Sequence, residues 1–191
     1  LSDSKVKEWI TYCTANGSDH GLHKSSLSTS ISEELEEFQF EVKANRNHFL
    51  KISLPQQYDE IEKAGLSLDS SLGFAEQIGY RNSYGLPFHP YNLAEDRPYE
   101  FLEVPLNIMD GSFIYYMKEN QSEAFDTVSK WIDNVKDHTM ITILWHNNEL
   151  SDATYPIMNK CYQSLIEKLA SEGYKPMIVK DLISKYKIYN A

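Results

Sequence analysis

The stretch Met140-Ile-Thr-Ile-Leu-Trp145 is nearly all apolar, and it predicts a buried strand more clearly than any other part of the chain. His146 follows directly, at the carboxyl end of this strand. Helical periodicity flanks the strand on both sides, from Ser122 to Lys136 and from Leu150 to Ser171. A buried strand between two such helices is typical of parallel α/β proteins.

The alternation of helix and strand extends over the rest of the chain. Further strands are predicted to end near His23 and Asp69 and to cover His48–Leu54, Tyr99–Met109 and Tyr174–Val179. Further helices are predicted from a Ser2 or Asp3 cap to Asn16, from Ser28 to Val42, from Pro55 to Gly65 and from Lys180 to Tyr186.

A long loop is predicted between Ser70 and Arg97, where Gly, Pro, Asn and Tyr are frequent. The chain contains no internal repeat and no stretch with the composition of a linker. We therefore expect residues 1–191 to form a single α/β domain.

The composition is that of a folded protein, with 41% hydrophobic and 24% charged residues. The formal net charge of -10 argues against nucleic-acid binding, which needs Lys and Arg to neutralise phosphates. No apolar run approaches the roughly 20 residues of a membrane helix, so we expect no membrane segment in this chain. Cys13 and Cys161 share no spacing motif and are interpreted as free thiols. The composition leaves the cytoplasm and the cell envelope open as locations.

Polar or titratable residues lie at several predicted strand ends: His23, the pair Arg46 and His48, Asp69, and His146. Ligands of parallel α/β proteins bind at the carboxyl ends of the strands, so we expect these side chains to share one pocket. Arg46 and His48 are two residues apart and would face the same side of a strand. Imidazole and carboxylate groups are suited to binding a divalent metal and to general acid–base chemistry.

Each of these residues also has a purely structural interpretation. A single histidine beside a strand often has a structural role, and Asp69 before two serines is typical of a capped turn. Arg46 is compatible with a solvated surface position. The occurrence of all of them at strand ends favours a shared site, but the structural alternatives remain open for each residue.

Several short motifs, taken in order, resemble the polysaccharide deacetylases of the NodB-homology group, carbohydrate esterase family 4. They are Gly21-Leu-His23-Lys-Ser25, Arg46-Asn-His48-Phe-Leu50, Gly65-Leu-Ser-Leu-Asp69-Ser70, Gly79-Tyr-Arg81, Met109-Asp110-Gly111 and Ile143-Leu-Trp-His146-Asn147. The chain is most similar to a divergent bacterial branch, over about residues 4 to 170. The ordered set is specific, whereas any one motif alone is not.

This resemblance implies a distorted (β/α) barrel that removes N-acetyl groups from amino sugars of a bacterial polysaccharide with a divalent metal, most often zinc. At the matching positions, His23 would bind the metal and Arg46 would orient the catalytic base. Asp69 would be the carboxylate partner of His146, and His146 would be the general acid. His48 stands where the family has a proline, and it would act as a substitute ligand or a substrate contact.

The resemblance places Arg81, Trp145 and Asn147 among the substrate contacts. It also implies that the family's aspartate-pair motif lies upstream of Leu1, so that the barrel of this chain would be N-terminally incomplete. Leu27 stands near the position of the second metal histidine.

These departures leave two other functions open. One is a non-catalytic carbohydrate-binding or scaffolding domain, with sugar stacking on tyrosines of the long loop region: Tyr80, Tyr84, Tyr91 and Tyr99. The other is a glycosidase that would use Asp69 and Asp110 as paired carboxylates.

Overall fold

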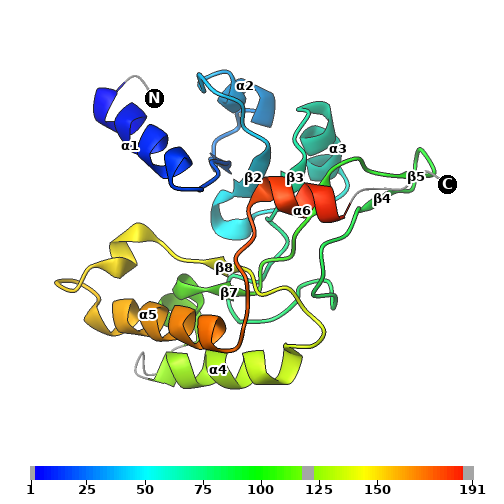
Figure 1. Ribbon diagram of the computed structural model, residues 1–191. Coiled ribbons are helices and arrows are strands. Elements are labelled where there is room, and N and C mark those ends of the chain that lie inside the picture. The colour runs from blue at the N-terminus through cyan, green and yellow to red at the C-terminus, as the bar shows by residue number, and fades with distance from the viewer. Residues whose placement is uncertain (1–2, 118–122, 187–191) are drawn as a thin grey trace. The chain divides into compact units, whose positions relative to one another are not determined.

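The computed structural model describes residues 3–117 and 123–186 and shows a mixed α/β protein with parallel strands (Figure 1). The chain divides into two compact units. Unit 1 takes its described residues from 3–72, 87–104 and 177–186, and unit 2 takes them from 73–86, 105–117 and 123–176. Each unit is described separately below.

Unit 1 contains a four-stranded parallel sheet with the order β1-β2-β3-β6. Its strands are β1 (Leu22–Lys24), β2 (Ala44–Asn47), β3 (Leu68–Asp69) and β6 (Leu102–Glu103). Parallel neighbours require crossover connections. Helices lie in the connections from β1 to β2 and from β2 to β3, whereas residues 70–101, which connect β3 to β6, contain no helix. The predicted parallel α/β class is therefore confirmed.

The helices of unit 1 are α1 (Ser4–Ala15), α2 (Ile31–Leu35), α3 (Gln56–Lys63) and α6 (Val179–Lys185). Local sequence explains where α2 begins, because Ser30 and Glu33 form a reciprocal capping box. One face of the sheet packs on α2 and α3 in a core cluster of Leu22, Ile31, Tyr58, Ile61, Leu66, Tyr99 and Phe101. A short antiparallel pair, β4 (Tyr91–Asn92) and β5 (Arg97–Pro98), belongs to the same unit.

Unit 2 contains the parallel pair β7 (Ile108–Met109) and β8 (Ile143–Leu144). Helix α4 (Ala124–Val135) packs against α5 (Pro156–Ser171), as Figure 1 shows. Two short helical turns, η2 (Ser112–Tyr116) and η4 (Asn147–Leu150), follow the two strands. The core cluster of this unit consists of Ile108, Phe113, Ala124, Val128, Ile132, Met158, Cys161 and Leu165.

The strand predicted over His48–Leu54 is wrong, because β2 ends at Asn47 and His48–Leu50 forms a 3-10 turn. The true strand escaped prediction because its buried residues, Asn45 and Asn47, are polar. The side-chain NH₂ groups of both asparagines donate hydrogen bonds, and these hold polar residues where the pattern requires apolar ones.

Several other predicted elements differ from the structure. The buried strand predicted at Met140–Trp145 is reduced to β8, whose residues are only partly buried, and the helix predicted from Leu150 begins at Pro156. The predicted strand Tyr99–Met109 is divided between β6 in unit 1 and β7 in unit 2, and the predicted strand Tyr174–Val179 is irregular. The helix predicted to reach Val42 ends at Leu35. Both cysteines are free, as predicted, and none of the described helices is long and apolar enough to cross a membrane.

Candidate functional site

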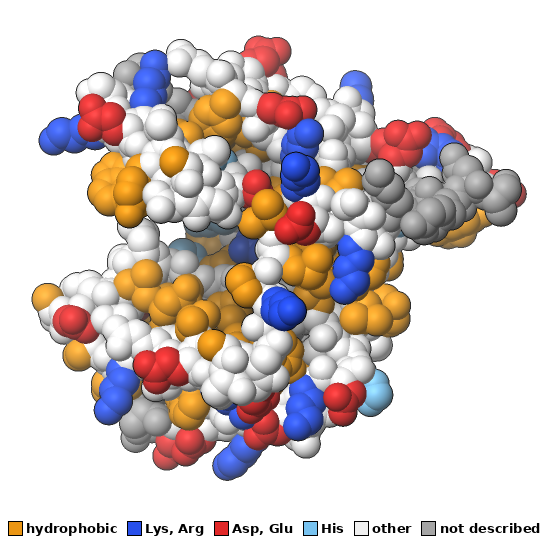
Figure 2. All heavy atoms as spheres, viewed as in Figure 1, with side chains coloured by type: hydrophobic (Ala, Val, Ile, Leu, Met, Phe, Trp, Pro, Cys, Tyr) orange, Lys and Arg blue, Asp and Glu red, His pale blue; other side chains and the backbone are white. Residues whose placement is uncertain are grey.

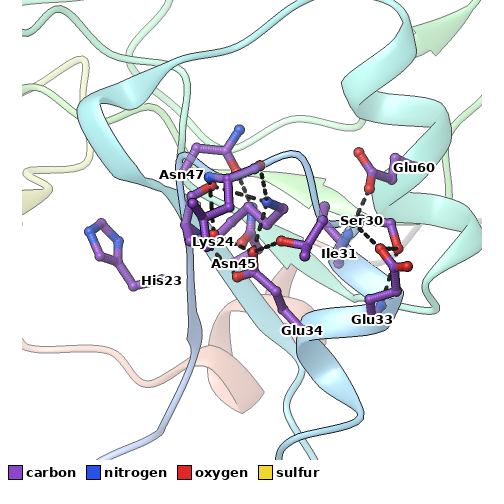
Figure 3. Close-up of polar contacts among 12 residues, drawn as sticks. His23, Lys24, Ser30, Ile31, Glu33, Glu34, Asn45, Asn47 and Glu60 are labelled. Carbon is purple, nitrogen blue, oxygen red and sulfur yellow. Dashed lines mark hydrogen bonds and ion pairs between the residues drawn. The ribbon is translucent and has the colours of Figure 1, made fainter.

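His23 and His48 form a pair at the carboxyl ends of β1 and β2 in unit 1. Their rings meet edge to face, with centroids 5.1 Å apart. Nδ1 of His23 lies 3.0 Å from the carbonyl oxygen of Arg46, and because a carbonyl only accepts, we assign the proton to Nδ1. Figure 3 shows the His23 ring on the side of β1 opposite to Lys24 and Asn45.

Arg46 lies beside His23 in the sheet and connects the end of β2 to the loop after β3. Its Nε donates to the carbonyl oxygen of Ser70 at 3.0 Å, and its Nη2 donates to Ser70 Oγ at 2.9 Å. Burial lowers the pKa of the Arg46 guanidinium, and the negative charges of Asp69 and Glu103 oppose that change. His23, Arg46 and His48 therefore lie together, in keeping with the sequence prediction for this part of the site.

Asp69 lies on the other face of the same sheet. Its strand partner is Asn45, which alternates with Arg46 and faces the buried side. The Asp69 carboxylate is fully buried and accepts hydrogen bonds from Asn45 Nδ2 at 2.7 Å, Ser71 Oγ at 3.0 Å and Ser71 N at 3.0 Å. This closed environment holds the loop after β3 and gives no support to the predicted catalytic role of Asp69 in unit 1.

Glu103 is paired with Asp69 across β3 and β6 and is also fully buried. Burial raises the pKa of Glu103 well above its ordinary value, and the nearby Asp69 charge raises it further. Burial also raises the pKa of Asp69, against the hydrogen bonds from Asn45, Ser71 and Glu103. Burial beside a second carboxyl group therefore disfavours the ionised form of Glu103. The sequence signal for a buried acidic group was Glu103 itself, an acidic residue among apolar strand residues.

Glu34 organises the loop that follows β1 (Figure 3). Its carboxylate accepts hydrogen bonds from Lys24 Nζ at 2.9 Å, Ser25 N at 2.9 Å and Thr29 Oγ1 at 2.6 Å. Partial burial alone would raise the pKa of Glu34, but the hydrogen bonds from Ser25, Thr29 and Lys24 lower it to about 2. The loop fixed in this way carries Leu27, whose side chain is exposed.

A zinc ion was predicted at His23 and His48. Among residues 3–117 and 123–186, no group of three or more His, Cys, Asp or Glu side chains could hold a metal ion. Catalytic zinc ordinarily has three protein ligands. The described residues therefore do not form a zinc site on their own, and zinc at this pair of imidazoles is only a proposal.

His146 and Asp110 form a hydrogen-bonded dyad in unit 2, beyond the carboxyl ends of β8 and β7. Nδ1 of His146 lies 2.7 Å from Oδ1 of Asp110, and the backbone N–H of His146 donates to Oδ2 at 2.5 Å. Asp110 is fully buried and also accepts from the backbone N–H of Gly111 at 2.6 Å, whereas His146 is exposed. Asp110 therefore occupies the position at His146 that the resemblance gave to Asp69.

The other predicted residues of unit 2 lie in different surroundings. Trp145 is half-buried, with its ring 5.3 Å from that of Tyr162, and Asn147 is exposed at the start of η4. Arg81 is exposed in the loop that follows Gly79. Sequence reasoning missed Glu149, which is 2% exposed and whose pKa is raised by burial and then by the charge of Asp110.

Acidic and basic side chains are interspersed on the face drawn in Figure 2.

No protein-family model matches the chain, and a search of curated proteins found no match. The fold is that of a mixed α/β protein with parallel sheets and helices.

Proposed function

We propose that this chain is a carbohydrate deacetylase of the polysaccharide deacetylase type, which hydrolyses N-acetyl groups on amino sugars of a bacterial polysaccharide. The proposal includes the finer fold, a distorted (β/α) barrel. The observation that carries it is the dyad of an exposed His146 and a buried Asp110 at the carboxyl ends of parallel strands. Ligands of parallel α/β proteins bind at this edge of a sheet.

The dyad provides the acid of such a reaction. Because Nδ1 of His146 donates to Asp110, the remaining ring nitrogen, Nε2, is the one that exchanges protons with a substrate. Asp110 fixes the tautomer and the ring orientation. Water would add to the acetyl carbon, and as the C–N bond breaks a protonated His146 would donate its Nε2 proton to the departing amine. The proton lost by the water would restore the imidazolium, and acetate would be released.

Unit 1 supports the proposal through His23, Arg46 and His48, which bring imidazole and guanidinium groups to another set of strand ends. We derive no step through a metal ion, because the described residues do not assemble three protein ligands.

Acetate release from N-acetylglucosamine oligomers, measured with and without added Zn²⁺, tests the proposal. We expect the purified protein to release acetate and the His146→Ala variant to be at least 100-fold slower, because general acid catalysis contributes about 10²–10⁴-fold. His138→Ala is the matched control, because His138 is also exposed in unit 2. Equal rates in wild type and His146→Ala, or no acetate release by wild type, would contradict the proposal.

A second candidate is a non-catalytic carbohydrate-binding or scaffolding domain. The observation in its favour is that Leu27, exposed in the loop after β1 and four residues past His23, offers no metal-binding group. Binding of the same oligomers without acetate release would support this candidate and contradict the first. Of the tyrosines predicted to stack on sugars, Tyr99 is buried and bonds Asp59, so it is not available for that role.

A further inference from the structure

Phe49 combines a strained backbone with an exposed aromatic ring. Its φ is +60° and that of Leu50 is +50°, in the left-handed region that bulky residues rarely adopt. The Phe49 side chain is nevertheless 67% exposed. The fold therefore holds an apolar ring in water at a conformational cost, a combination that stability does not explain.

The surroundings hold this conformation from both sides. Leu50, the next residue, is buried in the unit, and the side-chain amide of Asn47 donates to the carbonyl oxygen of Lys51 at 2.7 Å. The same amide donates to Gln57 Oε1 at 2.9 Å, which ties the turn to α3. Since these contacts fix the backbone on each side of Phe49, a glycine there would keep the turn and remove the strain.

The ring of Phe49 extends the histidine pair into a longer aromatic surface. It stacks on His48 with ring centroids 3.9 Å apart and an interplanar angle of 25°. His48 in turn meets His23 edge to face. One face of Phe49 is thus covered by an imidazole, and most of the remaining ring is open to solvent, at the carboxyl end of β2.

We propose that Phe49 is the stacking platform of a sugar subsite in unit 1 and takes the apolar C–H face of a pyranose ring. The proposal deepens the proposed function by placing its substrate class on named residues, and it rests on that function for the choice of sugar. A pyranose has an apolar face edged by hydroxyl groups, which matches an exposed phenyl ring beside imidazole hydrogen-bonding groups. The net charge of -10 disfavours an anionic ligand.

The test measures binding of chitotetraose and cellotetraose by isothermal titration calorimetry, together with thermal unfolding, in three variants of the purified protein. We expect Phe49→Gly to bind at least tenfold more weakly than wild type while unfolding at the same or a higher temperature. Phe49→Trp retains a stacking ring, so its affinity should stay within about threefold and its tryptophan emission should shift on binding. Leu93→Ala removes a comparably exposed apolar side chain of unit 1 and should bind like wild type.

Two outcomes would overturn the proposal: unchanged affinity in Phe49→Gly, and no binding of either sugar by wild type. The failure of the proposed function is distinguishable, because these measurements need no turnover. Loss of binding in Phe49→Gly without acetate release from any form supports the sugar subsite and rejects the deacetylase. Acetate release that depends on His146, with unchanged binding in Phe49→Gly, supports the deacetylase and rejects the sugar subsite.

Discussion

Replacing Glu34 by glutamine tests how strongly the loop after β1 is held. The carboxylate accepts charged and neutral hydrogen bonds from Lys24, Ser25 and Thr29, and these lower its pKa from 4.5 to about 2. At about 1.4 kcal/mol for each pKa unit, that interval corresponds to about 3 kcal/mol of stability at neutral pH. The side chain is 16% exposed, so solvent screening lowers our expectation to about 2 kcal/mol.

The sign of the pH dependence follows from the direction of the change. Because the pKa of Glu34 is lower in the folded state than in the unfolded state, its contribution is complete above pH 4.5 and disappears as the pH falls to about 2. Glu34→Gln should therefore lower the free energy of unfolding by about 2 kcal/mol at pH 7 and by progressively less between pH 4.5 and pH 3.

Urea denaturation at pH 7, 5 and 3.5 measures this difference directly. Glu37→Gln is the matched control, because it removes the same charge from an exposed position two residues past α2, and we expect a change below about 0.5 kcal/mol. If Glu34→Gln is as stable as wild type at pH 7, or if its deficit is constant down to pH 3.5, the assigned role of Glu34 is wrong.

Further predictions concern the His146–Asp110 dyad, Glu103 and the histidine pair. Asp110→Asn should slow acetate release by about 10²–10⁴-fold through loss of the correct His146 tautomer, and an unchanged rate would contradict the dyad. Burial and the Asp69 charge raise the pKa of Glu103, so wild-type stability should fall as the pH rises from about 4.5 through the folded-state pKa. Glu103→Gln should lack that decline in urea denaturation at pH 5, 7 and 9, and parallel curves for the two proteins would refute a raised pKa of Glu103. Replacing both His23 and His48 by Ala should weaken Zn²⁺ binding at least tenfold in a chelator competition assay, and equal affinity would exclude these imidazoles as ligands.

The parallel α/β class could be predicted from the alternation of apolar strands and amphipathic helices. The position of β2 could not, because Asn45 and Asn47 occupy its buried face and their side-chain bonds replace apolar packing. The interval from Tyr99 to Met109 looked like one strand because its residues are nearly all buried, yet they serve two different sheets. Periodicity reports burial, and it does not report which partner a buried segment has.

The candidate site, like the fold, could be predicted only in part. The sequence suggested that His23, Arg46 and His48 belong to one site, but their actual proximity depends on β2, which was not predicted and which pairs in parallel with β1. The partner of His146 did not follow, because Met109-Asp110-Gly111 has the composition of an ordinary turn. Only the pairing of β7 with β8 brings Asp110 to the imidazole. Two residues far apart in the chain become partners through strand register, which a single sequence does not reveal.

The two faces of the unit 1 sheet have different surroundings, so a motif residue such as Asp69 can face either one. Asn45 and Asp69 face the helices. The Asn45 side chain donates to Asp69, which also accepts from the Ser71 N–H, and these bonds fix the strand ends. Arg46, one residue from Asn45, faces the opposite side with His23. An aspartate at a strand end is therefore compatible with either task, and the strand pairing decides between them. In this sheet Asp69 is buried and hydrogen-bonded to Asn45 and Ser71, so its catalytic role stays a prediction and the proposal rests on the His146–Asp110 dyad.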